Sequence, residues 1–329
     1  MRDSFQRNIE YVRISITDLC NLRCRYCMPE AGVKKLRHGD VLTYEEILRV
    51  VRALAQLGIR KVRLTGGEPL LRPGIVDFVR RIKGVQGIEH VAMTTNGVLL
   101  SSMAGQLKEA GLDSVNVSVD TLREDAFVFL TRRALLPSVQ EGLEALFSAG
   151  FADVKLNCVP IAGVNEEDIV QLADLARQYD VKVRFIELMP IGCAFEAGLH
   201  GIPMDEVRKR LSEEYGTLLP VERNSSLQGP AEYACISGFR GQVGFIDAMG
   251  HKFCHTCNRV RLTAEGFLKL CLYSGTGLDV RVLLRSGAED GDLAKALARA
   301  IRRKPEAHSF LEESGGDVRD ARYMYQVGG

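Results

Sequence analysis

Three cysteines stand within eight residues near the start of this chain of 329 residues: Cys20, Cys24 and Cys27. Clustered free thiols oxidise readily and add little to packing, so their spacing indicates a chemical role, most directly metal ligation. An iron–sulfur cubane has four irons, and three thiolates leave one of them open. A structural zinc site would need a fourth ligand from elsewhere, and a redox-active or unligated group of thiols is the remaining alternative.

A second group follows near the C-terminus, where Cys254 and Cys257 precede Cys271. Two incomplete groups favour two clusters that each leave an iron for a small molecule, and one zinc cluster shared by all six thiols is the alternative. The histidines beside this group are expected to be solvated loop residues: His251 and His255. The isolated cysteines are predicted to be small buried hydrophobic residues: Cys158, Cys193 and Cys235.

The composition is that of a soluble globular protein, with 46% apolar residues, 26% charged residues and a net charge of +1. This balance gives no electrostatic reason to expect nucleic-acid or membrane binding. Residues 1–10 are polar, unlike a signal peptide, and no apolar run reaches the length of about 18 residues that a membrane span needs. An odd number of cysteines argues against a disulfide framework, so we expect a cytoplasmic protein.

Strand-like and helical segments alternate from residue 10 onward, which indicates βα units with parallel strands and right-handed crossovers. Six strands are predicted, at Tyr11–Thr17, Lys61–Thr65, His90–Thr95, Ser114–Val119, Asp153–Val159 and Val181–Glu187. Five helices are predicted, at Thr43–Leu57, Gly74–Lys83, Ser102–Ala110, Pro137–Ser148 and Glu166–Tyr179. Thr43 and Glu46 form a capping box, and three glycines occupy helix C-cap positions: Gly58, Gly111 and Gly150.

A polar face on three of these strands distinguishes between an open doubly wound sheet and a barrel. In the first strand, Val12 and Ile14 alternate with Arg13 and Ser15. Buried parallel strands are usually apolar throughout, so this alternation favours a complete or incomplete barrel whose interior holds a polar ligand.

Polar motifs follow the strands at the end where βα barrels place their active sites. Gly66-Gly67-Glu68-Pro69 follows the second strand, where the glycines would let the backbone approach a ligand and Glu68 could bind an ammonium group. A purely structural turn is the alternative. Thr94–Gly97 and Ser118–Asp120 follow the third and fourth strands, and the first cysteine group follows the first strand.

The pattern changes after Pro190, so we divide the chain into residues 1–190 and 191–329. In the second part, helices are predicted at Met204–Glu214, Asp279–Arg285 and Asp292–Lys304, and strands at Tyr233–Ile236, Gln242–Ile246, Val260–Thr263 and Phe267–Cys271.

The first cysteine group, with Tyr26 before its third cysteine and the Gly-Gly-Glu-Pro motif, resembles the radical S-adenosylmethionine superfamily. The resemblance implies an α/β fold with an incomplete (β/α)6 TIM-like barrel. It also implies that Cys20, Cys24 and Cys27 ligate a [4Fe–4S] cluster whose open iron binds S-adenosylmethionine, which is cleaved to a 5′-deoxyadenosyl radical. The residues implied to contact S-adenosylmethionine are Tyr26, Gly67, Ser118 and Met189.

Residues 253–261 with Cys271 resemble the auxiliary-cluster signature of the GTP 3′,8-cyclase family of molybdenum cofactor biosynthesis (MoaA), as do residues 184–189 and the terminal Gly328-Gly329. The resemblance implies a C-terminal α+β domain in which Cys254, Cys257 and Cys271 hold a second [4Fe–4S] cluster. It implies a lyase that converts GTP to (8S)-3′,8-cyclo-7,8-dihydroguanosine 5′-triphosphate. By the same resemblance, the radical removes the ribose C3′ hydrogen, and the open iron of the second cluster contacts the guanine.

Further expectations come from this resemblance. The C-terminal tail reaches the active site, an electron donor of unknown identity is needed, and cyclic pyranopterin monophosphate synthase uses the product. A homodimer is compatible with the family. The chain departs from the family at Thr131-Arg132-Arg133, where Thr-Gly-Arg is more usual, which puts that loop in doubt.

Basic residues give an independent indication of the ligand. Arg13, Arg63 and Lys155 lie within predicted strands, where an unpaired buried cation is costly, and a triphosphate would satisfy them. Pairing with helix carboxylates is the alternative. Arg259 and Arg261 share one strand face and add planar donors suited to phosphate. These two arginines and the three cysteines of the first group are the candidate catalytic residues. The family resemblance assigns seven residues to GTP: Arg13, Arg63, Thr94, Lys155, Arg259, Val260 and Arg261.

Two other functions remain open from the sequence. One is a peptide-modifying radical S-adenosylmethionine enzyme with an auxiliary cluster, which would bind a peptide where we expect the triphosphate. The other is a non-catalytic iron–sulfur or zinc protein.

Overall fold

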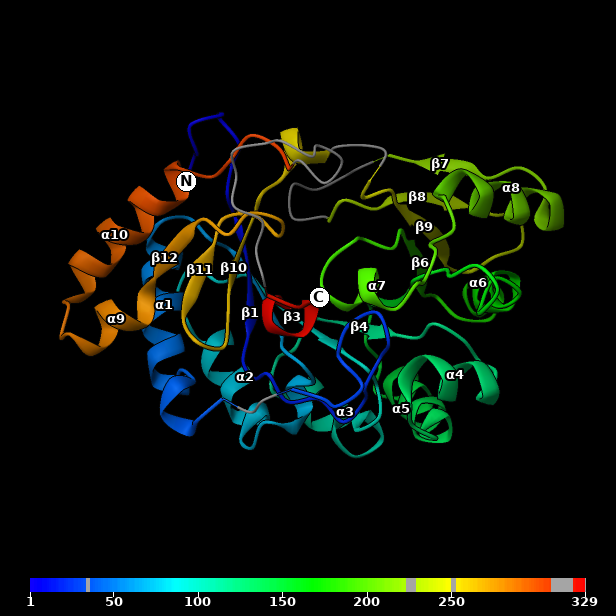
Figure 1. Cartoon of the computed structure of the whole chain (residues 1–329), viewed down its shortest axis with the longest axis horizontal. Coiled ribbons are helices and arrows are strands. Elements are labelled where there is room, and N and C mark those ends of the chain that lie inside the picture. Colours follow the sequence, from blue (N-terminus) through cyan, green and yellow to red (C-terminus); the bar gives the residue numbers. More distant parts are fainter. Residues whose placement is uncertain (34–35, 223–228, 250–252, 309–321, 329) are drawn as a thin grey trace.

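The computed structural model describes residues 1–33, 36–222, 229–249, 253–308 and 322–328. His251 and Gly329 lie outside this part of the chain. The described strands form one 12-stranded sheet (Figure 1), in the order β12-β11-β10-β1-β2-β3-β4-β5-β6-β9-β8-β7. The bounds of the strands are β1 Tyr11–Ser15, β2 Lys61–Thr65, β3 His90–Thr95, β4 Ser114–Ser118, β5 Val154–Cys158, β6 Lys182–Ile186, β7 Leu219–Val221, β8 Glu232–Cys235, β9 Gln242–Ile246, β10 Arg259–Leu262, β11 Phe267–Lys269 and β12 Gly277–Asp279.

Helices line the outside of this curved sheet, as Figure 1 shows for α1, α2, α3, α5 and α6. The α-helices are α1 Tyr44–Gln56, α2 Ile75–Lys83, α3 Leu100–Glu109, α4 Glu124–Thr131, α5 Leu136–Ser148, α6 Asp168–Gln178, α7 Cys193–Glu196, α8 Met204–Tyr215, α9 Val280–Arg285, α10 Asp290–Arg302 and α11 Met324–Val327. Three short 3₁₀ helices are η1 His38–Asp40, η2 Pro69–Leu71 and η3 Phe253–Thr256.

Strands β1 to β6 are parallel and lie side by side in chain order, which confirms the six predicted βα units. The sheet ends at β12 and β7 within the described residues, so the barrel is incomplete, as expected. The second and third predicted strands match the observed bounds, and the first ends two residues earlier, at Ser15. The capping box at Thr43 is also confirmed.

Strands from the C-terminal part extend both edges of the barrel. β10 pairs in parallel with β1, and β9 pairs in parallel with β6. Beyond them the pairing becomes antiparallel, through β11 and β12 at one edge and through β8 and β7 at the other. The sheet therefore contains strands from both sides of residue 190. The division of the chain into residues 1–190 and 191–329 stays a prediction.

Helix α4 is one of the elements that the sequence did not predict, together with β7, β12, α7 and α11. Its residues Phe127, Val128, Phe129 and Leu130 form a continuous apolar run, which gives no helical period. Phe127 and Leu130 are buried, whereas Val128 and Phe129 are 40% and 43% exposed. The C-terminal end of the helix packs against the first cysteine group. One part of the site was therefore not predicted.

The alternation in the strands has the predicted structural result. Val12 and Ile14 are fully buried in the hydrophobic core, which includes the outer face of the sheet and the helices that pack on it. Arg13 and Arg63 lie on the opposite face and line a cavity. None of the helices in the described ranges is both long and apolar enough to cross a membrane.

Candidate active site

A cavity of about 710 Å³ occupies the interior of the barrel and is lined by residues from both ends of its strands, such as Lys61 and Thr65 of β2. Both cysteine groups line it, although they are separated by more than 200 residues in the sequence. Of the predicted site residues, those that line the cavity are Arg13, Cys20, Cys24, Tyr26, Cys27, Arg63, Gly67, Thr94, Ser118, Lys155, Met189, Cys254, Cys257, Arg259, Arg261 and Cys271. Val260 is the exception, because its side chain is fully buried in the core.

The chemistry of the first cysteine group is compatible with binding an iron–sulfur cluster. The thiols are free, and burial raises the pKa of Cys20 to about 11. Burial also raises the pKa of Cys24, and the neighbouring Cys27 and Cys20 raise it further, so the three sulfurs lie close enough to affect one another. Such thiols would bind metal as thiolates and release protons on binding.

No three His, Cys, Asp or Glu side chains in the described ranges surround a point closely enough to hold one metal ion. A cubane makes a different demand, since each thiolate binds a separate iron and the sulfurs need not meet at one point. The donor set therefore fits an iron–sulfur cluster with three protein ligands.

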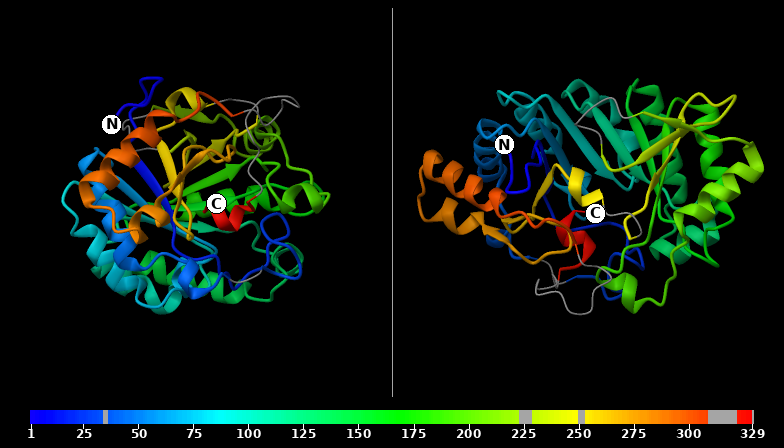
Figure 2. Two further views of the ribbon diagram at one scale, coloured as in Figure 1. Left: turned by 60° about the vertical axis from the view of Figure 1, so that its left-hand side comes forward. Right: turned by 90° about the horizontal axis from the view of Figure 1, so that it is seen from above.

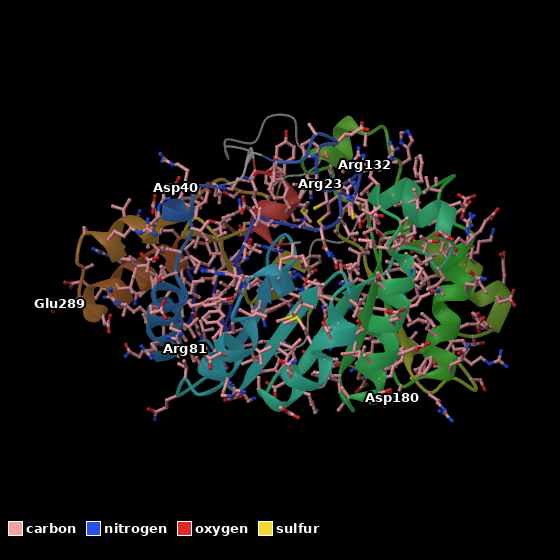
Figure 3. The ribbon with its side chains drawn as sticks, turned by 90° about the horizontal axis from the view of Figure 1, so that it is seen from below. Arg23, Asp40, Arg81, Arg132, Asp180 and Glu289 are labelled. Carbon is pink, nitrogen blue, oxygen red and sulfur yellow. The ribbon has the colours of Figure 1, made fainter. Side chains whose placement is uncertain are left out.

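Two arginines fix the backbone of this cysteine loop. Arg23 Nη1 donates to the carbonyl oxygens of Cys20 and Leu22 over 2.6 and 2.9 Å. Arg132, at the end of α4, donates through Nη1 to the carbonyl oxygens of Arg23 and Met28 over 2.7 and 3.3 Å. Figure 3 shows Arg23 and Arg132 side by side above the sheet.

The departure from the family at Arg132 has a structural explanation. Its backbone adopts a left-handed conformation, with φ of 56°, which favours the glycine that is more usual there. In this chain the residue keeps that backbone, and its side chain donates to the cysteine loop instead. The loop is thus formed with the altered sequence.

The close contacts of the Gly-Gly-Glu-Pro motif are made to other parts of the same protein. A Cβ on Gly67 would lie 2.2 Å from the carbonyl oxygen of Leu19, so the close approach that requires glycine is to the cysteine loop. Glu68 is 1% exposed, and its carboxylate accepts from Thr95 Oγ1, Asn96 N and Leu70 N over 2.7 to 2.9 Å. Its oxygens are therefore used to join the ends of β2 and β3, as the structural alternative predicted.

Other polar side chains surround the first cysteine group. Tyr26 Oη donates to Asp120 Oδ2 over 2.5 Å, which links the cysteine loop to the end of β4. Asn96 Nδ2 donates to Asn21 Oδ1 over 2.7 Å and lies 3.7 Å from Cys20 Sγ. This end of the cavity thus combines thiols with fixed hydrogen-bonding groups.

The middle of the cavity is strongly cationic. The lining cations are Arg13, Lys61, Arg63, Lys155, Lys182, Arg184, Arg259, Arg261 and Lys304. Burial lowers the pKa of Lys61 to about 8, with a further contribution from Arg63. Burial and the charge of Arg261 lower the pKa of Arg13. Buried cations that destabilise one another in this way favour an anionic ligand.

Arg63 and Lys155, two of the predicted cations, contact polar side chains of the chain itself. Arg63 Nε donates to Tyr11 Oη over 2.6 Å, and Lys155 forms an ion pair with Asp153. The pairing alternative therefore holds for Lys155, although its carboxylate comes from the residue before β5 rather than from a helix. Burial raises the pKa of Tyr11, but Arg63 and Arg13 lower it more, to about 7.

In the second cysteine group, Cys254 lies on η3, Cys257 directly follows η3, and Cys271 follows β11. Burial raises the pKa of Cys257, but the charges of Arg259 and Lys304 outweigh this and lower it to about 6. The guanidinium of Arg259 lies over the ring of Phe253, 5.1 Å from its centroid. This group therefore combines a readily ionised thiol with cationic neighbours.

The C-terminal tail enters the same cavity, where Met324 and Tyr325 line the wall. Both views of Figure 2 place α11, in red, between the orange C-terminal helices and the green region of α7 and α8. Arg261 Nη1 donates to the carbonyl oxygen of Gly328 over 2.6 Å. The expected approach of the tail to the site is confirmed for the described residues.

Several cavity residues were missed by sequence reasoning. Lys61 could have been found, because it lies two residues before Arg63 on the same strand face. Arg184 was quoted only as part of a motif, and its guanidinium donates through Nε to Asn157 Oδ1 over 2.9 Å. Asn96 and Tyr11 had no distinguishing signal beyond their place in or after a strand. Of the isolated cysteines, Cys158 and Cys193 are buried as predicted, whereas Cys235 is half-buried; His255 is exposed.

Comparisons with known proteins agree with this geometry. The model of the radical SAM superfamily matches residues 14–176, and the model described as Molybdenum Cofactor Synthesis C matches residues 181–310. The chain is 49% identical to a GTP 3′,8-cyclase of Pelotomaculum thermopropionicum and 46% identical to one of Moorella thermoacetica, over 100% of each chain. Among solved structures, Streptococcus suis SuiB bound to S-adenosylmethionine matches with a TM-score of 0.62 and 14% identity, over 90% of this chain and 68% of SuiB. That likeness shows the fold alone.

Proposed function

The chain belongs to the GTP 3′,8-cyclase family of the radical SAM superfamily, and from that premise we propose that it converts GTP to (8S)-3′,8-cyclo-7,8-dihydroguanosine 5′-triphosphate. This is the first step of molybdenum cofactor biosynthesis. The radical SAM family implies a [4Fe–4S] cluster and S-adenosylmethionine as cofactors. When bound, they supply a 5′-deoxyadenosyl radical that removes the hydrogen from the ribose C3′.

The observation that carries the proposal is a cationic cavity with a group of three thiols on each side. A nucleoside triphosphate carries several negative charges, and buried guanidinium groups recognise phosphate oxygens through paired N–H donors. The thiols of Cys20, Cys24 and Cys27 would hold the first cluster. Those of Cys254, Cys257 and Cys271 would hold the second.

On the side of the first cluster, the chain's residues would orient S-adenosylmethionine. The backbone of Gly67 is fixed by its N–H bond to the carbonyl oxygen of Thr17 over 2.8 Å. Tyr26, Ser118 and Met189 complete the proposed contacts, and each lines the cavity.

On the opposite side, the residues proposed to bind the triphosphate are Arg13, Arg63, Thr94, Lys155, Arg259 and Arg261, all of which line the cavity. Val260 could contribute only through its backbone, because its side chain lies in the core. Thr94 accepts from Arg63 Nη1 over 3.3 Å, so the two act as one unit.

Replacement of Arg259 tests the triphosphate site. We expect Arg259→Ala to weaken GTP binding by about 10- to 100-fold, the loss typical of a charged hydrogen bond, while both clusters still assemble. Arg80→Ala, on the exposed face of α2, is the matched control. GTP affinity equal to that of the unaltered chain would remove Arg259 from the site.

The complete reaction distinguishes the cyclase from the peptide-modifying alternative. Anaerobic incubation with GTP, S-adenosylmethionine and a reductant should give 5′-deoxyadenosine in a GTP-dependent manner, together with the cyclised nucleotide. If 5′-deoxyadenosine formed without any change in GTP, the cyclase proposal would fail. Metal analysis after anaerobic purification should give about eight irons with matching sulfide, whereas stoichiometric zinc would support a zinc protein.

The proposed setting follows from the same chemistry. Nine cysteines without a disulfide suit a reducing compartment, which supports the cytoplasm. We propose an external electron donor, transfer of the product to cyclic pyranopterin monophosphate synthase, and a homodimer as the assembly to be tested.

A further inference from the structure

The N-terminal arm, residues 1–9, contains a buried ion pair that the proposed reaction does not use. Asp3 and Arg7 are 3% and 7% exposed, and Arg7 Nε donates to Asp3 Oδ2 over 2.6 Å. Asp3 Oδ1 also accepts from the backbone N–H groups of Phe5 and Arg7, both over 2.9 Å. A carboxylate with this many donors holds its arginine in one orientation.

Arg7 reaches two segments that lie far away in the sequence. Its Nη1 donates to the carbonyl oxygen of Cys254 over 2.8 Å and to that of Glu306 over 2.7 Å. Its Nη2 donates to the carbonyl oxygen of Pro305 over 2.6 Å. A planar guanidinium can satisfy several carbonyls at fixed angles, so the side chain ties the second cysteine loop to the segment after α10.

The Cys254 carbonyl is central to the turn that carries two of the thiols. It also accepts from the backbone N–H of Cys257 over 3.1 Å, which closes η3. A guanidinium fixed on this oxygen therefore limits how Cys254 and Cys257 can move relative to one another.

The third thiol is tied through Lys304. This residue is 3% exposed, and its Nζ donates to the carbonyl oxygen of Leu270, which precedes Cys271. Arg7 Nη2 lies 3.5 Å from the carbonyl oxygen of Lys304 itself. The backbone of all three cysteine segments is thus connected to the Asp3–Arg7 pair.

We propose that Asp3 and Arg7 form a clamp that positions Cys254, Cys257 and Cys271 for cluster binding. Arg7 is a positioning residue, because its hydrogen bonds go to Asp3 and to backbone carbonyls. The ligand of these thiols rests on the proposed function, whereas the clamp itself rests on the hydrogen bonds.

The test compares Arg7→Lys with Arg2→Lys in the full chain. Lysine keeps the positive charge beside Asp3 but replaces the planar fork with one ammonium group, so it cannot serve Cys254, Pro305 and Glu306 together. Arg2 lies on the same arm, is exposed and donates to Asn8 Oδ1 over 3.3 Å, which makes it the matched control.

The first readout is the alkylation rate of each cysteine in the metal-free, reduced chain, with iodoacetamide as the probe and mass spectrometry for assignment. In Arg7→Lys we expect the second group to react at least about threefold faster, through local opening, and the first group to be unchanged. A general loss of stability would accelerate both groups alike, and that result would overturn the proposal.

The second readout is iron content and the electron paramagnetic resonance of the reduced protein after anaerobic reconstitution. The unaltered chain and Arg2→Lys should bind about eight irons, and Arg7→Lys should approach about four with the signal of the first cluster retained. Equal alkylation rates and equal iron in Arg7→Lys and the unaltered chain would overturn the clamp. Only about four irons in the unaltered chain would contradict the proposed second cluster, and the alkylation comparison would still decide the clamp.

Discussion

Lys155 shows how a single buried cation should make ligand binding depend on pH. Burial lowers its pKa to about 7, Asp153 opposes that change, and Arg184 and Arg63 add to it. Above pH 7 the free chain therefore loses this proton, whereas a bound triphosphate favours the charged form. GTP binding would then take up a proton, so affinity should fall as pH rises, by up to about tenfold per pH unit for one group.

Isothermal titration of GTP into the metal-loaded chain between pH 7.5 and 9 checks this expectation, because the terminal phosphate, with a pKa of about 6, is already ionised there. Lys155→Arg keeps the charge over this range and should reduce the slope, leaving the contributions of Lys61 and Tyr11, whose pKa values also lie near this range. The same dissociation constant at every pH would show that Lys155 does not titrate on binding.

The backbone conformation of Gln6 leads to a second prediction, about stability. It is exposed and has a φ of 63°, a left-handed conformation that costs about 1–2 kcal/mol for a residue with a Cβ. Glycine removes this strain but loses about 0.5–1 kcal/mol in chain entropy. We expect Gln6→Gly to raise the free energy of unfolding by about 0.5–1 kcal/mol in urea titration, and Gln6→Ala to give no gain. Lower stability of the glycine variant would contradict the assigned strain.

The short helix α11 brings the C-terminus into the barrel, and Gly328 is the residue that permits it. Its φ is 71°, and an added Cβ would lie 2.1 Å from Thr65 Oγ1. Gly328→Ala should displace the tail from Arg261 and lower GTP-dependent product formation at least about tenfold, the effect of about 1.4 kcal/mol. Cleavage of S-adenosylmethionine without GTP should persist.

The matched control is Gly287→Ala, since Gly287 has a φ of 81° with open space around its Cβ position. It shares the backbone strain without the collision, and its product yield should match that of the unaltered chain. Equal loss of product in both variants would assign the effect to general backbone strain.

At the scale of elements, the repeated βα units and the polar strand faces were predictable, because the periodicity of Val12, Arg13 and Ile14 reports burial directly. Glu68 was harder, since its carboxylate could serve a ligand or the chain, and only the structure shows that Thr95, Asn96 and Leu70 donate to it. The Asp3–Arg7 clamp was not predictable. Its carbonyl partners lie about 250 to 300 residues away, and backbone acceptors leave no mark in the sequence.

The topology of the whole sheet explains why the two cysteine groups, which are far apart in the sequence, line the same cavity. Strand β10 pairs with β1 through Val12 and Val260, so the strand that follows Cys254 and Cys257 lies beside the strand that precedes the first group. Because the two strands are parallel, the second group lies near the amino end of β1, whereas the first group follows the carboxyl end of β1. One continuous sheet therefore sets the two thiol groups around one cationic cavity, which is the arrangement that the proposed reaction requires.

In the proposed reaction, a radical generated at the first cysteine group removes the C3′ hydrogen of a GTP bound in this cavity. The most direct measurement uses GTP with deuterium at C3′, incubated anaerobically with the holoenzyme, S-adenosylmethionine and a reductant, followed by mass spectrometry of the 5′-deoxyadenosine. We expect one deuterium in the 5′-deoxyadenosine that forms in the presence of GTP. 5′-Deoxyadenosine without deuterium, beside unchanged labelled GTP, would contradict it.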